Sequence, residues 1–349
     1  MNEKLTLSDN DKLNFINSFS TLFNAGIPII EIVDSLLEDS KGNTQKILTI
    51  LREDLIQGKR LYTSLLRFPR TFDKVTINTI RAAEEAGTLD IILKDILIQI
   101  KKDMELEDKL KGALVYPAII MVVFFGVLIL ILTVAIPKIA EVFSRLDIVL
   151  PLPTRMLIAV SDLLMNHTIP TILVFGVTIT IIILIFRSRK QVILNLVFQL
   201  PIISQLIKEI DLTRFCRSVH LLLNSGVAIT NTLDLAKEVV IRQDIKIAIN
   251  HTREIVLSGG NLTDGFKENK SLFSSIMIKT IEAGEKTGTL DKSMQDMAEY
   301  LDYQVSNTIK TLTILIEPFM IVVIGGFIGG MMLSILGPIY GIIGQIGGR

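Results

Sequence analysis

Two glutamates occupy matching places in a duplicated sequence, and they are the main candidates for functional side chains. Glu84 and Glu285 each lie three residues before a glycine, Gly87 or Gly288, that begins a Gly-Thr-Leu-Asp tetrapeptide. Each glutamate falls in the last turn of an expected helix, where the helix dipole disfavours a negative charge by roughly 0.3–1 kcal/mol. Each carboxylate therefore needs a partner. That partner is either internal, as a salt bridge or a hydrogen bond to the following loop, or external, as another subunit or an ion.

The other candidate chemistry in the sequence is weak. The three histidines, His167, His220 and His251, are scattered, and none has a second ligand at the spacing of a metal site. The stretch 284–288 (Gly-Glu-Lys-Thr-Gly) lacks the glycine that precedes the lysine in a phosphate-binding loop. It also ends an expected helix, whereas such a loop must begin one. The sequence thus contains no candidate catalytic, cofactor-binding or metal-ligating residues.

The composition indicates a membrane protein. Hydrophobic residues make up 49% of the 349 residues, and the uncharged runs 112–137, 163–186 and 318–348 are each long enough to cross a bilayer. The net charge is zero, so no bulk field attracts nucleic acid, and no nucleic-acid partner is expected. Cys216 is the only cysteine, which excludes an internal disulfide.

Lysine and arginine residues lie mainly before the first apolar run and after the second. The positive-inside rule then places the N-terminus in the cytoplasm and the C-terminus outside. The expected segments are a first cytoplasmic helical bundle (1–111), a transmembrane helix (112–137), an external loop (138–167), a second transmembrane helix (168–186), a second cytoplasmic bundle that repeats the first (187–317), a third transmembrane helix (318–338) and a short external tail (339–349).

Apolar residues recur at helical spacing throughout both soluble segments, and alternating strand patterns are almost absent. Ser8 is placed to cap the first helix, and Gly26 and Gly87 to end helices. We therefore predict an all-α integral membrane protein with two repeated bundles of about six helices each and three transmembrane helices.

The third apolar run carries a pattern typical of helix packing in lipid. Gly325, Gly326, Gly329 and Gly330 form two overlapping Gly-x-x-x-Gly pairs, which let two helix backbones approach closely. We expect a helix–helix contact at this face and a homo-oligomer, a dimer or larger.

The order of motifs resembles the F-type inner-membrane platform proteins of type II secretion and their type IV pilus counterparts. The resemblance covers about 13–137 and 213–338. The residues that carry it in the first copy are Ala25-Gly26-Ile27-Pro28, Phe72, Glu84, Gly87-Thr88-Leu89, Tyr116-Pro117 and Pro137. Those in the second copy are Ser225-Gly226-Val227, Phe273, Gly284-Glu285, Gly288-Thr289-Leu290, Glu317-Pro318 and Pro338.

This resemblance implies a platform in the inner membrane that is not an enzyme and has no cofactor. Its partners would be a cytoplasmic assembly ATPase, pilins or pseudopilins, and other inner-membrane assembly proteins, in type IV pilus biogenesis, type II secretion or competence. Two other classes remain open. A small transporter or permease subunit is disfavoured by the uncharged spans. A membrane scaffold unrelated to filaments is compatible with the sequence but does not account for the duplicated motif order.

Overall fold

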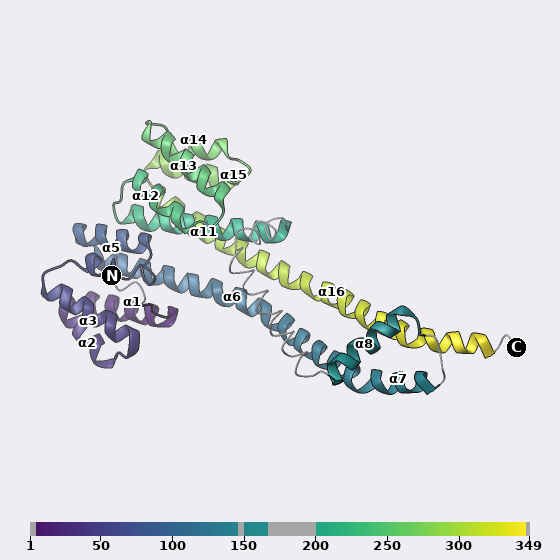
Figure 1. The fold of residues 1–349 in the computed structure, drawn as a ribbon. Helices are drawn as coiled ribbons and strands as arrows, with labels where there is room; N and C mark the ends of the chain where they lie inside the picture. Colours follow the sequence, from purple (N-terminus) through teal and green to yellow (C-terminus); the bar gives the residue numbers. More distant parts are fainter. Residues whose placement is uncertain (1–4, 146–149, 167–199, 347–349) are drawn as a thin grey trace. The chain divides into compact units, whose positions relative to one another are not determined.

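The computed structural model describes residues 5–145, 150–166 and 200–346. Within these ranges the regular structure is entirely helical (Figure 1). The all-α prediction is therefore confirmed for the described part of the chain.

The chain divides into two compact units. The first unit contains the ranges Met1–Lys109 and Gln205–Thr308, and it holds the two helical bundles. The second unit contains Leu110–Ser204 and Ile309–Arg349, and it holds the most apolar helices.

Local signals explain the ends of the helices in the first bundle. The Ser8 hydroxyl accepts a hydrogen bond from the backbone amide of Asp11 at 3.2 Å and so caps the first helix. Gly26 has a φ of +82°, a left-handed conformation that suits the residue after a helix. The helices of this bundle are α1 (Asp9–Asn24), α2 (Ile29–Asp39), α3 (Gly42–Ile56), α4 (Leu61–Leu65), α5 (Lys74–Ala86) and the beginning of α6 (Leu89–Leu130).

The second bundle repeats this order of elements, as the labels in Figure 1 show. A 3₁₀ turn, Lys237–Val239, follows its second helix. The helices are α11 (Pro201–Asn224), α12 (Ile229–Ala236), α13 (Gln243–Leu257), α14 (Leu262–Glu268), α15 (Ser275–Thr287) and the beginning of α16 (Leu290–Ile346).

The two bundles have unequal apolar cores. The core of the first bundle includes Leu221 and Leu222, which belong to the second bundle, and Val227, Leu235 and Val239 pack against it. The core of the second bundle draws only on its own residues within the described part of the chain. Burying an aliphatic side chain of this size contributes roughly 1.5–3 kcal/mol, so the first bundle gains stability from its neighbour.

The second unit contains a helical hairpin of apolar elements. After α6 the chain forms a five-residue π-helix, Ile131–Ala135, then α7 (Ile136–Arg145) and α8 (Leu152–Asn166). The hydroxyl of Ser161 on α8 donates to the Leu132 carbonyl oxygen at 2.5 Å, which gives one π-helical carbonyl a side-chain donor. The range expected as an external loop is thus largely helical where it is described.

Among the described residues, two helices are long and apolar enough to cross a membrane. They span Leu89–Arg145 and Leu290–Pro338, and most side chains in their apolar windows are not covered by protein. The third expected span, 168–186, lies outside the described residues. The expected boundaries at 111/112 and 317/318 fall inside continuous helices.

Candidate functional site

Glu84 accepts hydrogen bonds from the start of a neighbouring helix. Its Oε1 lies 3.0 Å from the backbone nitrogen of Leu61, and its Oε2 lies 3.3 Å from that of Tyr62. These amides belong to the first turn of α4, where no intrahelical acceptor is available. The preceding residue, Arg60, supplies no side-chain cap. The carboxylate at the end of α5 therefore caps α4.

Glu285 makes the same contact in the second bundle and adds one. Its oxygens accept from the backbone amides of Leu262 at 2.5 Å and Thr263 at 3.1 Å, at the start of α14. The Thr263 hydroxyl donates to the same carboxylate at 2.6 Å. Both glutamates are half-buried and engaged inside their own bundle.

The two glycines that follow these glutamates end the helices in a left-handed conformation. Gly87 has a φ of +72° and Gly288 one of +73°. The next amide, from Thr88 or Thr289, donates to the carbonyl oxygen five residues earlier at 2.9 Å in both copies. This turn ends the helix three residues after the glutamate. The carboxylate thus lies in the last helical turn, beside the start of α4 or α14.

Gly284 is a second glycine that the fold requires, and for a different reason. A Cβ at this position would lie 2.7 Å from Cβ of Ser293 and would also collide with the Ser293 hydroxyl oxygen. The glycine thus permits α15 to approach the first turns of α16. The first copy has Ala83 at the corresponding position, so the sequence repeat alone did not reveal the requirement.

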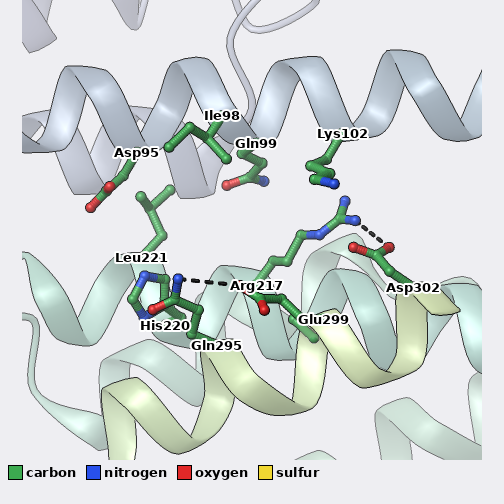
Figure 2. A pocket seen from close by; sticks show the side chains of 11 residues that line it. Asp95, Ile98, Gln99, Lys102, Arg217, His220, Leu221, Gln295, Glu299 and Asp302 are labelled. Carbon is green, nitrogen blue, oxygen red and sulfur yellow. Dashed lines mark hydrogen bonds and ion pairs between the residues drawn. The ribbon is translucent and has the colours of Figure 1, made fainter.

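A charged cluster joins the two bundles. Arg217 on α11 forms ion pairs with Asp103 on α6, at 3.1 Å, and with Asp302 on α16. Figure 2 shows the guanidinium reaching Asp302, with Lys102 projecting from α6 toward the same space. Desolvation by the surrounding protein raises the pKa of the Asp103 carboxyl, while the positive charge of Arg217 opposes that rise.

Other polar contacts also join the two bundles. Asn224 donates to Asp95 at 2.8 Å, and Lys74 pairs with Glu238 at 3.6 Å. A cavity of about 100 Å³ lies between the bundles and is lined by residues of α6, α11 and α16 (Figure 2). Its wall mixes acidic, basic and apolar side chains, which is typical of an interface between packed modules.

The glycines of α16 are uncovered among the described residues. A Cβ added to Gly325, Gly326, Gly329 or Gly330 would meet no other atom within 4 Å. Gly326 and Gly330 line an apolar groove together with residues of α8. Helix packing at this face remains a prediction.

None of the described residues form a group of three or more ligands suited to a metal ion. Sequence reasoning missed the cluster around Arg217, because a single arginine on a helix gives no local signal of its partner. It did identify the two glutamates and the glycines that follow them.

The chain matches one protein-family model twice, once in each copy of the repeat. The model describes protein F of the type II secretion system, and it matches residues 15–137 and 215–338.

Curated relatives align over nearly the whole chain. The type IV pilus assembly protein PilC of Thermus thermophilus is 30% identical, with 95% of this chain and 82% of the relative covered. PilC of Myxococcus xanthus is 28% identical, with 96% and 81% covered. The type II secretion system protein F of Aeromonas hydrophila is 27% identical, with 92% and 83% covered.

Proposed function

The chain belongs to the type II secretion system protein F family, and we propose that it is an inner-membrane platform for filament assembly. The observation that carries this function is the double match, because it covers most of both helical bundles and most of both described apolar helices. Relatives named for type IV pilus assembly and relatives named for type II secretion are similar to the chain at comparable identities. The machine can therefore be a pilus, a secretion system or a competence system.

The role we propose is mechanical and not enzymatic. The platform couples a cytoplasmic assembly ATPase to pilins or pseudopilins in the membrane, and it contacts other inner-membrane assembly proteins. The contact around Arg217 supports this role, since it joins the two bundles through α6 and α16. These are the same helices that continue into the apolar segments. A load applied to either bundle would thus reach both helices.

The proposed topology places both bundles in the cytoplasm, with the N-terminus inside and the C-terminus outside. The lysines of the first bundle near 101–111 and the basic residues at 187–190 support this orientation. Single cysteines at Lys59 and at Gly348 would test it. A membrane-impermeant thiol reagent applied from outside should label only the second.

The direct test of function is deletion of the gene in its native host. Filament assembly or secretion should be lost and should return with the wild-type chain. Crosslinking in native membranes should capture a hexameric ATPase and a pilin-like protein with the tagged platform. A deletion strain that assembles filaments and secretes normally would overturn the proposal. A strain defective only in the uptake of a small solute would favour a transporter instead.

A further inference from the structure

The contact between the two bundles is unequal. The first bundle contributes α5 and α6, whereas the second contributes α11, α12 and α16. The helices α6 and α16 are equivalents in the repeat, but α5 contacts α12, which is not its equivalent. Among the described residues, only the core of the first bundle takes in side chains from its neighbour. The part formed by α5 and α12 joins two different faces, so it is heterologous and leaves one copy of each face unused.

The faces in contact and their unused counterparts follow from the repeat. The "α5 face" and the "α12 face" are the pair in contact inside the chain, and the "α15 face" and the "α2 face" are their respective equivalents. The α5 face comprises Lys74, Val75 and Asn78, and the α12 face comprises Asn231, Asp234, Leu235 and Glu238. The α15 face comprises Ser275, Ile276 and Lys279, and the α2 face comprises Glu31, Asp34, Ser35 and Glu38.

The α5 and α15 faces differ in exposure at one aliphatic position. Val75 is only 1% exposed, but its equivalent Ile276 is 48% exposed. On the partner side, Leu235 is half-buried against the first core, while its equivalent Ser35 is exposed. The α15 face therefore has one large exposed aliphatic side chain, Ile276. The α2 face has the polar Ser35 where the α12 face has Leu235.

The unused faces also carry complementary charges. In the covered contact, Asn78 and Asn231 line the same crevice between the bundles. Their equivalents are Lys279 and Glu31, which have opposite charges and are both exposed. Glu38 adds a further negative charge to the α2 face.

One acidic residue beside the α15 face has its own counter-charges. Glu282 pairs with Lys267 at 3.2 Å and with Lys286 at 2.8 Å. These pairs offset the charge of Glu282, so the α15 side is left with the positive charge of Lys279 to attract acidic residues.

We propose that the α2 face of one copy binds the α15 face of a second copy, in the arrangement that the two bundles use within the chain. The contact repeats head to tail and forms a closed ring where its rotation permits. Because it depends on exposed charges, it weakens as the salt concentration rises. This self-association goes beyond the proposed platform function and is tested without any filament assay.

Thiol crosslinking of the full chain in membranes tests the contact. The natural Cys216 is fully buried, so introduced cysteines are the accessible thiols. A chain with Glu31→Cys and Lys279→Cys, treated with a short bis-maleimide, should give a ladder of multimers. Differently tagged chains that carry one cysteine each should crosslink with one another but not with themselves. Exposed Glu53 on α3 provides the control pair, Glu53→Cys with Lys279→Cys, which should give no ladder.

Charge reversal provides an independent measurement in the same membranes. In chains that carry the cysteine pair Ser35→Cys and Ser275→Cys, Glu31→Lys or Lys279→Glu alone should reduce the crosslinked fraction several-fold. The two reversals together should restore it. Cys216 that stays unreactive to maleimide would show that each variant is folded. Crosslinking no stronger than the Glu53 control would overturn the proposal. Efficient crosslinking of Glu31→Cys with itself, or reversal effects that do not compensate, would also overturn it.

Discussion

Glu84 and Glu285, 201 positions apart in the sequence, accept hydrogen bonds from the first amides of equivalent helices, α4 and α14. Each carboxylate belongs to the end of one helix and satisfies the start of another. The cost of placing a negative charge at a helix C-terminus, roughly 0.3–1 kcal/mol, is offset by charge-assisted hydrogen bonds of about 1.5–3 kcal/mol. This geometry supplies an internal reason to keep both residues.

Glu84→Gln and Glu285→Gln should both lower the stability of the folded protein. An amide keeps one acceptor oxygen and turns its NH₂ group toward the second backbone donor, which costs about 1–3 kcal/mol. Glu285→Gln should cost more, because Thr263 adds a third donor. Thermal unfolding of the full chain in detergent checks this order. Variants that melt like the wild type but fail in filament assembly would instead indicate contact with another subunit or an ion.

Gly284→Ala should destabilise the second bundle. The new methyl group would overlap Ser293, and overpacking of this kind costs about 1–3 kcal/mol. Gly112→Ala is the matched control, since a Cβ at Gly112 meets no atom within 4 Å. Ala is favoured over Gly in a helix by about 1 kcal/mol, so the control should be neutral or stabilising. Equal melting temperatures of the two variants would show that α15 and α16 do not pack closely enough for the new methyl group to overlap Ser293.

Cys216 should react with maleimide only in the unfolded chain. Burial raises the pKa of its thiol, so the reactive thiolate does not form in the folded protein near neutral pH. Raising the pH from 7 to 8.5 should accelerate alkylation of the unfolded chain roughly tenfold, because an ordinary cysteine has a pKa near 8.5. The folded chain should stay unlabelled at both pH values. Rapid labelling of native protein would contradict the burial of α11.

The raised pKa of the Cys216 thiol also makes the free energy of unfolding depend on pH. Above a pH of about 8.5 the unfolded chain binds fewer protons at this thiol than the folded chain does. Stability should therefore fall as the pH rises through this range, and the fall should be smaller in Cys216→Ala. Denaturant unfolding at pH 7.5 and pH 9.5 provides the measurement.

Gly326→Leu combined with Gly330→Leu should weaken self-association within the membrane. Both positions are uncovered, and leucine side chains would keep a second helix from approaching the α16 backbone. Crosslinking of the full chain in membranes, at positions away from the α2 face, reports the change. Unchanged crosslinking would exclude this face as a contact between copies.

The sequence was sufficient for features whose cause is local. Ser8, Gly26 and Gly87 act through their own turn of backbone, and all three have the expected roles. Features that depend on distant residues were not predictable. Arg217 pairs with Asp103, which lies 114 positions away in the sequence. Gly284 is required only because α15 packs closely against α16.

The effect of proline on the apolar helices also depends on tertiary surroundings. Proline usually interrupts a helix, but α6 continues through Pro117 to Leu130. A proline removes one backbone donor, and apolar spans tolerate this where neighbouring groups satisfy the freed carbonyl. Periodicity alone does not reveal such compensation.

The unequal cores have a consequence for biosynthesis. Aliphatic side chains of the second bundle, as far along the chain as Val239, pack against the core of the first bundle. Val239 lies roughly 130 residues after Lys109, where the first bundle ends. At a translation rate of about 5–20 residues per second, the ribosome needs on the order of ten seconds to supply them. During that interval the nascent bundle has an unfilled apolar face, and a stalled chain would be prone to aggregate or to require a chaperone. The core of the first bundle is therefore completed only after part of the second bundle has been synthesised.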